Sequence, residues 1–350
     1  MNSRLLHERF RLHVLPMRFA REFSDIGSFR LSKFMAMASL AGRLAYRLLF
    51  HRPDAVYMTP TPAGPSFVRD ALFLSIVNLF AVRKIIHLHG RGIRDAYKGS
   101  LFYRLLYRWA FWGAQVIHLS ERLKSDVSIA VPDGNIHIVN NGVAAPVPPV
   151  SVDTPPRNGP PVLLYLSNLT PKKGVFVLLE ALKLLSGEGI DFRAHLAGAP
   201  GAPQTMVELR QACDETLLRG RVDYAGIVVG EPKDRLLRQS DIFVMPTLYD
   251  AFPLVALEAM AYALPVVCSE EGSLPDIVRD GETGVLVEKG NAPALAAALR
   301  PLLLDPERRR QMGIAGLRRY EANFTMGRLE ANLAAVIDDC IDKFRRRAGS

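Results

Sequence analysis

Glu258 is a carboxylate inside a strongly apolar segment of this 350-residue chain. Apolar residues flank it on both sides between residues 240 and 267, and their pattern predicts a helix that protein covers all round. Burying an unpaired carboxylate is costly, so a stable fold must supply hydrogen-bond donors to its oxygens. The adjacent hydroxyls of a sugar are donors of this kind, and a sugar ligand is therefore the first hypothesis.

The residues before Glu258 predict a strand, a loop and a helix start. Residues 242–245 form a short apolar run of strand length, which Pro246 and Thr247 end. Pro253 is expected at the first helical position, where its missing N–H costs nothing. In an open α/β sheet, ligands bind at the carboxyl ends of strands, and a helix N-terminus there offers backbone donors to a phosphate. A diphosphate fits this place.

An upstream segment predicts the same arrangement. Residues 162–166 are typical of a buried strand, residues 167–174 of a loop, and residues 175–185 of a helix. Lys173 stands just before the helix, beside Gly174, which lets the backbone approach a ligand, and together they suit a phosphate clamp. The alternative is an ordinary solvated loop.

The stretch from Asp250 to Glu258 resembles the E-x7-E element of the family 4 retaining glycosyltransferases (glycosyl transferases group 1), with aspartate in the first position. It is followed by that family's E-A-M-A and P-V-V. The upstream loop resembles the family's G-R-L-x-x-x-K-G, with Ser167 and Asn168 in place of Gly-Arg. The resemblance is dense over residues 161–291 and implies an α/β chain of the GT-B fold, with two Rossmann-like doubly wound domains facing a cleft.

The resemblance also assigns roles. It gives Asp250 to the donor sugar, as a catalytic residue, and Glu258 to the nucleotide ribose. Asp250 as a helix N-cap and Glu258 as a glutamate reaching solvent from a helix edge are the alternatives. Further donor-binding residues are implied in the phosphate loop, at two strand ends and at the helix start: Asn168, Lys172, Lys173, Gly174, Gly198, Ile227, Phe252, Pro253, Leu254 and Val255.

Seven prolines between residues 144 and 161, without apolar periodicity, mark a linker. We therefore expect an N-terminal acceptor-binding domain over residues 1–145 and a linker over 146–161. A C-terminal nucleotide-sugar-binding domain should follow over 162–323, and the resemblance implies that residues 324–350 form a helix that crosses back to the first domain.

The first domain departs from the family pattern at its beginning. Residues 1–8 resemble the tail of the family's first helix and residues 10–15 its second strand, so the opening strand and glycine-rich loop are missing. Either the reading frame is truncated or wrongly started at Met1, or the protein has lost part of its cleft. Downstream, strands are expected over residues 54–58 and 84–89, with a helix over residues 66–82 between them.

His89 ends the second of these strands, where the family has a histidine facing the donor sugar, and the resemblance makes it a catalytic residue. His87 points to the same face by strand alternation. A satisfied core histidine is the alternative for both. Arg91 and Arg94, just past the strand, are candidates for binding an anionic acceptor, and Asn141 with Gly142 resembles the family's N-G turn.

Residues 1–150 hold 20 lysines and arginines against nine aspartates and glutamates, so the first domain is the basic one. No recognisable nucleic-acid motif accompanies this charge, and nucleic acid is not expected as a partner. Residues 29–50 mix large apolar residues with Arg30, Lys33, Arg43 and Arg47, which suits a helix lying on an anionic membrane surface. A plain amphipathic helix packed on the sheet is the alternative.

Three scattered cysteines give neither a disulfide framework nor a metal pair and favour a reducing cytosol. No signal peptide is recognised, and the longest apolar stretch, residues 71–82, is too short to span a bilayer. No two aspartates lie two positions apart, so a bridging metal lacks its D-x-D ligands and no cofactor is expected. We expect a cytoplasmic protein, or a peripheral one on the inner face of the cell membrane.

The resemblance implies a hexosyltransferase-type enzyme that is retaining and metal-independent. It would move a sugar from a UDP- or GDP-sugar to a hydroxyl of a glycan or lipid-linked acceptor, in bacterial surface polysaccharide or lipopolysaccharide synthesis. A degenerate, non-catalytic nucleotide-sugar-binding subunit and a nucleotide-sugar epimerase of the same fold are the alternatives. Which sugar, nucleotide and acceptor are used does not follow from the sequence.

Overall fold

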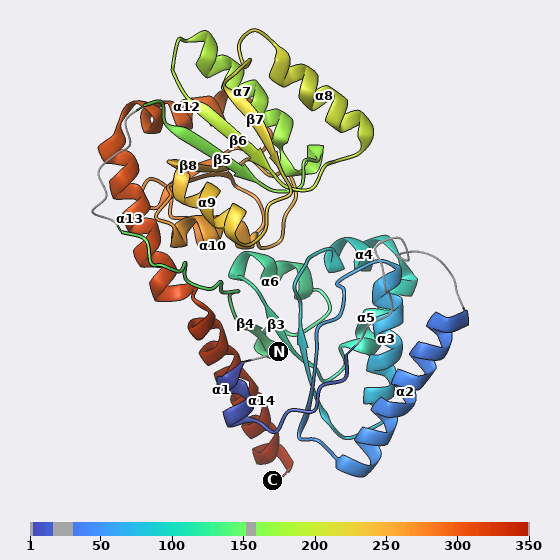
Figure 1. The fold of residues 1–350 in the computed structure, drawn as a ribbon. Helices are drawn as coiled ribbons and strands as arrows, with labels where there is room; N and C mark the ends of the chain where they lie inside the picture. Colours follow the sequence, from blue (N-terminus) through green and yellow to red (C-terminus); the bar gives the residue numbers. More distant parts are fainter. Residues whose placement is uncertain (1–2, 17–30, 152–158, 349–350) are drawn as a thin grey trace. The chain divides into compact units, whose positions relative to one another are not determined.

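The computed structural model describes residues 3–16, 31–151 and 159–348 (Figure 1). The chain forms two compact units. Unit 1 comprises Met1–Val139 and Glu330–Ser350, and unit 2 comprises Asn140–Leu329. Parts of the expected linker, residues 152–158, and of the expected interfacial helix, residues 29 and 30, lie outside the described residues.

Unit 2 contains a six-stranded, fully parallel sheet in the order β10-β9-β8-β5-β6-β7. Its central strands are apolar on both faces, as strands sandwiched between helices must be. The chain order reverses between β5 and β8. The strands are β5 (Val162–Leu166), β6 (Arg193–Ala197), β7 (Val222–Gly226), β8 (Ile242–Met245), β9 (Val266–Ser269) and β10 (Gly284–Val287).

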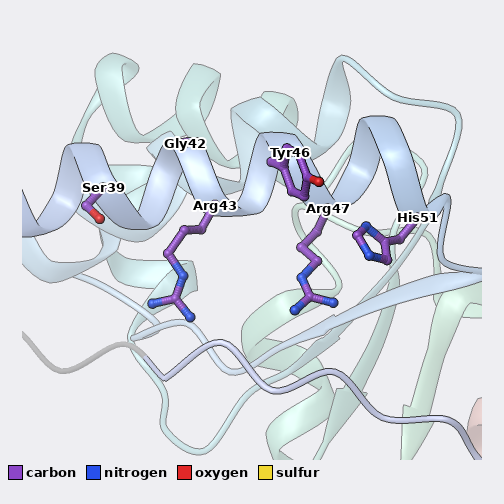
Figure 2. Close-up of a pocket in the computed structure, with 6 residues that line it drawn as sticks. All are labelled: Ser39, Gly42, Arg43, Tyr46, Arg47 and His51. Carbon is purple, nitrogen blue, oxygen red and sulfur yellow. The ribbon is translucent and has the colours of Figure 1, made fainter.

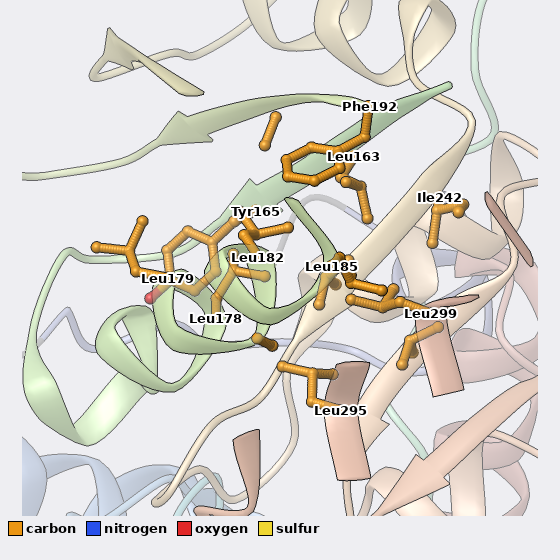
Figure 3. Close-up of a cluster of buried hydrophobic side chains, with 14 of the residues drawn as sticks. Leu163, Tyr165, Leu178, Leu179, Leu182, Leu185, Phe192, Ile242, Leu295 and Leu299 are labelled. Atoms are coloured by element: carbon orange, nitrogen blue, oxygen red, sulfur yellow. The ribbon is translucent and has the colours of Figure 1, made fainter. Parts of the chain in front are cut away.

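Helices connect these strands. On one face, Leu178, Leu182 and Leu185 of α7 pack into the same buried cluster as Leu163 and Tyr165 of β5 (Figure 3). The regular i, i+4, i+7 spacing of the three leucines explains why this helix forms against the sheet. The helices of unit 2 are α7 (Val175–Gly187), α8 (Pro203–Asp214), α9 (Glu231–Gln239), α10 (Leu254–Ala261), α11 (Leu274–Ile277), α12 (Ala292–Leu304) and α13 (Pro306–Asn323), with a short 3₁₀ turn at Pro171–Lys173.

Unit 1 is built on a four-stranded parallel sheet in the order β1-β2-β3-β4. Its core includes a tilted ring pair, Phe67 on α3 and Tyr107 on α5, with ring centroids 4.4 Å apart. The elements are α1 (Arg4–Arg9), α2 (Leu31–His51), β1 (Ala55–Met58), α3 (Pro65–Asn78), β2 (Arg83–His87), α4 (Ile93–Gly99), α5 (Leu101–Ala110), β3 (Gln115–His118), α6 (Glu121–Val127), a 3₁₀ turn (Asp133–Asn135), β4 (Ile136–Ile138) and the long α14 (Met326–Ala348), which starts in unit 2.

The segments by which the chain enters and leaves unit 2 run side by side. The Val143 N–H donates to the Phe324 carbonyl at 2.9 Å, and the Met326 N–H donates to the Val143 carbonyl at 3.1 Å. A Cβ on Gly142 would lie 2.4 Å from the Thr325 carbonyl oxygen. Gly142 therefore makes a close backbone contact that only glycine permits.

Two expectations for unit 1 need correction. Residues 10–15 were expected as a strand, but no strand is assigned to residues 10–16, which follow α1. A strand requires a neighbour with which to exchange hydrogen bonds, and β1 pairs only with β2 among the described residues. The helix expected over residues 66–82 ends at Asn78, whose side chain accepts a hydrogen bond from the buried Lys84 ammonium.

Candidate functional site

The carboxyl ends of β5 and β8 form the switch point of the unit 2 sheet. From β5 the chain continues to β6 on one side, and from β8 it continues to β9 on the other. Connections leaving neighbouring strands in opposite directions open a crevice at the strand ends, where ligands of α/β proteins bind. Residues 167–174 and 246–253 follow these two strands, and they lead into the N-termini of α7 and α10.

These two loops are fastened to each other through backbone atoms. The Lys172 carbonyl accepts hydrogen bonds from the Leu248 and Tyr249 N–H groups, at 2.9 and 3.1 Å. Gly174 has φ +76°, and a Cβ there would lie 1.8 Å from the Pro246 carbonyl oxygen. The close approach thus requires a glycine, and it holds the start of α7 beside the β8 loop.

Lys173 and Asp250 meet across the two loops. The Lys173 ammonium lies 2.5 Å from Asp250 Oδ2 and donates to the Tyr249 carbonyl at 3.3 Å. An ammonium has three N–H groups, so one remains for a ligand. Asp250 is not the helix cap that was one alternative, because the N-cap of α10 is Pro253. Pro253 was itself expected to be the first residue of this helix, but the helix begins one residue later, at Leu254.

Glu258 lies on α10, and its two carboxylate oxygens have different surroundings. The Lys233 ammonium of α9 is 2.7 Å from Oε1, whereas Oε2 is buried and has no hydrogen-bond partner among the described residues. The helix is not covered all round, since the Glu258 side chain is 23% exposed and Leu254 is exposed. Sequence reasoning missed Lys233, which stands 25 residues before Glu258 with no local pattern linking them. A buried orphan acceptor is the feature that a ligand hydroxyl satisfies.

The other expected donor residues occupy varied positions. Asn168 and Lys172 are exposed in the β5 loop, while Phe252 and Pro253 are buried and support the helix start. Ile227 is exposed directly after β7, the edge strand.

Two further expected donor residues, Gly198 and Val255, lie at a strand end and at a helix start. At the end of β6, Gly198 has φ +141°, and a Cβ there would lie 2.0 Å from the Ser167 carbonyl oxygen, so its role is close backbone packing. Val255 is half-buried in the first turn of α10.

In unit 1, His87, His89 and His118 cluster at the ends of β2 and β3. The His87 and His89 rings are 4.2 Å apart, and His87 Nδ1 lies 2.6 Å from the Tyr57 hydroxyl oxygen. His118 Nδ1 accepts a hydrogen bond from the Leu119 N–H at 2.8 Å. His87 and His118 are fully buried, whereas His89 is exposed. His89 was expected to end the strand, but β2 ends at His87, so His89 follows the strand and contacts His87 from there.

The arginines expected to meet an acceptor follow β2. The Arg94 guanidinium donates to the Ser125 carbonyl at 2.9 Å, and Asp126 accepts hydrogen bonds from the N–H groups of Gly92, Ile93 and Arg94. Arg91 lies in the preceding turn. The acceptor-binding role of Arg91 and Arg94 and the catalytic role of His89 stay predictions.

Burial sets the protonation of the histidine cluster. It lowers the pKa of His87 to about 3, with repulsion from His89 and His118 as smaller causes. It lowers the pKa of His118 to about 4, partly opposed by Asp126. Both rings are therefore neutral at pH 7.

The cluster should make unit 1 acid-sensitive. Unfolded histidines have a pKa near 6.5, so below that pH the unfolded chain binds more protons and the free energy of unfolding falls as the pH falls, down to the folded values. Between pH 7 and pH 5 we expect a loss of about 2 kcal/mol for each of the two buried histidines. Urea unfolding followed by tryptophan fluorescence measures this in unit 1, because Trp109 and Trp112 are the two tryptophans of the chain.

His118→Gln should remove about half of that pH dependence, and the matched change of the exposed His7 should leave it intact. A free energy of unfolding that is equal at pH 7 and pH 5 would contradict the assignment.

Within residues 3–16, 31–151 and 159–348, no group of three or more His, Cys, Asp or Glu side chains is placed to hold a metal ion. None of the helices described there is both long enough and apolar enough to cross a membrane.

Comparison with known proteins identifies relatives of this chain. Residues 150–319 match the family described as glycosyl transferases group 1. The alpha-maltose-1-phosphate synthase of Mycolicibacterium smegmatis is 31% identical over 232 residues, 60% of this chain and 59% of that protein. The D-inositol 3-phosphate glycosyltransferase of Corynebacterium diphtheriae is 34% identical over 181 residues, 51% of this chain and 42% of that protein. The chain thus matches roughly half the length of these curated relatives.

Solved structures show the fold. The Anabaena protein HepE in complex with UDP-glucose superposes with a TM-score of 0.69 at 20% identity, over 86% of this chain and 82% of that one. With two Rossmann-like units, one on a four-stranded and one on a six-stranded parallel sheet, the chain has the expected GT-B fold.

Proposed function

We propose that the chain, whose residues 150–319 match the family described as glycosyl transferases group 1, transfers a sugar from a nucleotide-diphosphate donor to a hydroxyl acceptor. The observation that carries the proposal is Oε2 of Glu258 on α10, which is buried and has no hydrogen-bond partner within the part of the chain that the structure describes. Ribose hydroxyls satisfy such an acceptor. Lys173, which keeps one N–H for a ligand, supplies positive charge from the facing loop.

The proposed chemistry exchanges one bond for another at the anomeric carbon of the sugar. The bond from this carbon to the diphosphate oxygen breaks, and a bond to the acceptor oxygen forms on the same face, so configuration is retained. The acceptor's proton passes to the leaving phosphate. Lys173 and the N-termini of α7 and α10 stabilise the negative charge of the departing nucleoside diphosphate without a metal ion. Asp250 contacts the donor sugar.

We propose a UDP- or GDP-sugar as the donor, and HepE, whose structure contains UDP-glucose, supports the class. We propose a glycan or a lipid-linked acceptor, and a role in bacterial surface polysaccharide or lipopolysaccharide synthesis, on the cytoplasmic side of the membrane. The functions of the curated relatives, an alpha-maltose-1-phosphate synthase and a D-inositol 3-phosphate glycosyltransferase, support sugar transfer as the activity class.

Nucleotide release tests the proposal. The full chain is incubated with UDP- and GDP-sugars, with and without membrane lipid extract and with excess EDTA. Acceptor-dependent release that persists in EDTA supports a metal-independent transferase. Nucleotide-sugar binding without release under any condition identifies the non-catalytic binding subunit instead, and absence of binding overturns both.

The Lys173→Ala change should weaken the binding of a nucleoside diphosphate by about 1.5–3 kcal/mol, the range for hydrogen bonds to charged groups. Isothermal titration calorimetry measures the loss. Lys183→Ala is the matched control, because Lys183 lies in the same unit and pairs with Glu180 and Glu215, far along the helix from the β5 loop. Unchanged affinity in Lys173→Ala would remove the phosphate role of this lysine.

A further inference from the structure

Helix α5 presents an apolar face to solvent. Its exposed large side chains follow the three- and four-residue spacing that places them on one side of a helix. They continue into the turn after the helix, where Trp112 is 67% exposed. The residues are Leu101, Phe102, Leu105, Trp109 and Trp112, and we call them the α5 face.

Helix α3 extends this surface and holds it in place. The Trp109 indole N–H donates to Ser75 Oγ at 2.8 Å, and the Asn78 amide donates to the Trp109 carbonyl at 2.8 Å. Leu79 on the same helix end is 77% exposed. The Trp109 and Trp112 rings stack with centroids 6.3 Å apart. The aromatic pair is therefore part of an ordered surface.

Positive charge borders the α5 face. Arg104 and Arg108, one turn apart on α5, are exposed beside the apolar residues. Neither α5 nor the exposed part of α3 carries an acid, because Asp70 is buried against Arg69. The neighbouring α2, which packs on α3, adds a second basic region.

That region is a hollow of about 580 Å³ along α2. Figure 2 shows Arg43 and Arg47 extending from the same side of the helix into it, with Ser39, Tyr46 and His51 along its edge. Leu40 and Leu48 of α2 are buried, so the helix packs on unit 1 as the plain amphipathic alternative expected. Met35, Tyr46, Leu49 and Phe50 of α2 are exposed and add to the apolar surface of unit 1.

We propose that the α5 face, with Arg104 and Arg108, docks on an anionic membrane surface. Tryptophan combines an apolar ring with a polar N–H and suits the water–lipid interface, and arginine heads beside it attract anionic lipid headgroups. A second copy of the chain is a poorer occupant, since a two-fold contact through α5 would bring these arginines close to their own copies, and α5 itself carries no acid. Every residue used lies in unit 1, so the proposal is independent of the donor site.

Co-sedimentation of the full chain with vesicles tests the docking. Vesicles of phosphatidylcholine with phosphatidylglycerol should bind the chain about tenfold or more tightly than phosphatidylcholine alone, because each interfacial arginine adds attraction. Leu105→Ser with Trp112→Ser should lower binding to anionic vesicles by about tenfold or more, since the buried apolar area is lost. Arg104→Gln with Arg108→Gln should reduce the difference between the two vesicle types.

The matched control is Leu217→Ser with Leu304→Ser, two exposed leucines of unit 2, which should bind vesicles as the unchanged chain does. An unaltered urea transition shows that each variant is folded. Equal sedimentation with both vesicle types, or full binding by the Leu105 and Trp112 variant, would overturn the proposal. So would a lipid-free dimer, seen by light scattering, that the same variant dissociates, because that outcome assigns the face to a second copy.

Discussion

Glu258→Gln is expected to weaken the binding of a ribonucleoside diphosphate by about 10- to 100-fold, the equivalent of one lost hydrogen bond to a charged group. The Lys233 ammonium fixes the outcome, because it requires an oxygen at the position of Oε1, 2.7 Å away. The amide must therefore place its NH₂ group where Oε2 is buried now. That group donates where a ribose hydroxyl needs an acceptor.

The prediction has a chemical control and a protein control. A 2′,3′-dideoxynucleoside diphosphate lacks the hydroxyls in question, so its affinity for the Glu258→Gln variant should change little. Glu282→Gln replaces an exposed carboxylate that pairs with Arg279 in the same unit, and it should leave both affinities unchanged. Calorimetry with the two ligands distinguishes the roles, since an equal loss for both would make Glu258 a structural residue.

Gly174→Ala should lower the stability of unit 2 by about 3–5 kcal/mol, an exceptional value for one methyl group. Two costs add. The φ of +76° is unfavourable for any residue with a Cβ, and the new methyl would lie 1.8 Å from the Pro246 carbonyl oxygen. Since neither loop can retreat without breaking the Lys172 carbonyl contacts, nucleotide binding should be lost as well.

Gly189→Ala isolates the first cost, the strain of the positive φ. Gly189 follows the other end of α7 with φ +78°, but a Cβ there meets nothing within 4 Å, so only the backbone strain of about 1–2 kcal/mol is expected. Hydrogen–deuterium exchange of peptides from β5 and β8 during urea titration reports on unit 2 directly. If Gly174→Ala and Gly189→Ala lower the stability equally, the clash with the Pro246 carbonyl costs nothing. That result would show that the loops after β5 and β8 move apart easily.

Local pattern predicted the strands that lead into the two loops well. The strands β5 and β8 have the bounds expected from their apolar runs, because a proline or a polar loop ends each run. Gly174 was expected to let the backbone approach a ligand, and it does permit a close backbone approach, to the Pro246 carbonyl. In each case a nearby residue type or a family pattern carried the information.

Features that depend on distant parts of the chain were not predicted. The Lys233 contact with Glu258 arises from the packing of α9 beside α10, which no local periodicity records. Residues 10–15 have strand composition but no strand partner among the described residues. The α5 face was missed because an amphipathic sequence does not tell which of its apolar residues a neighbouring helix covers, and here Tyr107 and Ala110 are buried while Leu105 and Trp112 are exposed.

The paired backbone hydrogen bonds between Val143 and the segment around Phe324 make unit 2 an insertion with adjoining ends. A domain whose two ends lie close together can be inserted into a loop of another protein with little change to that protein's fold, because the insertion separates the two sides of the loop only slightly. Residues 140–329 are therefore one contiguous segment of the gene. They lie between the two segments of unit 1, residues 1–139 and 330–350. Recombination of this one contiguous stretch would exchange the entire six-stranded sheet, together with Lys173 and Glu258, in a single event.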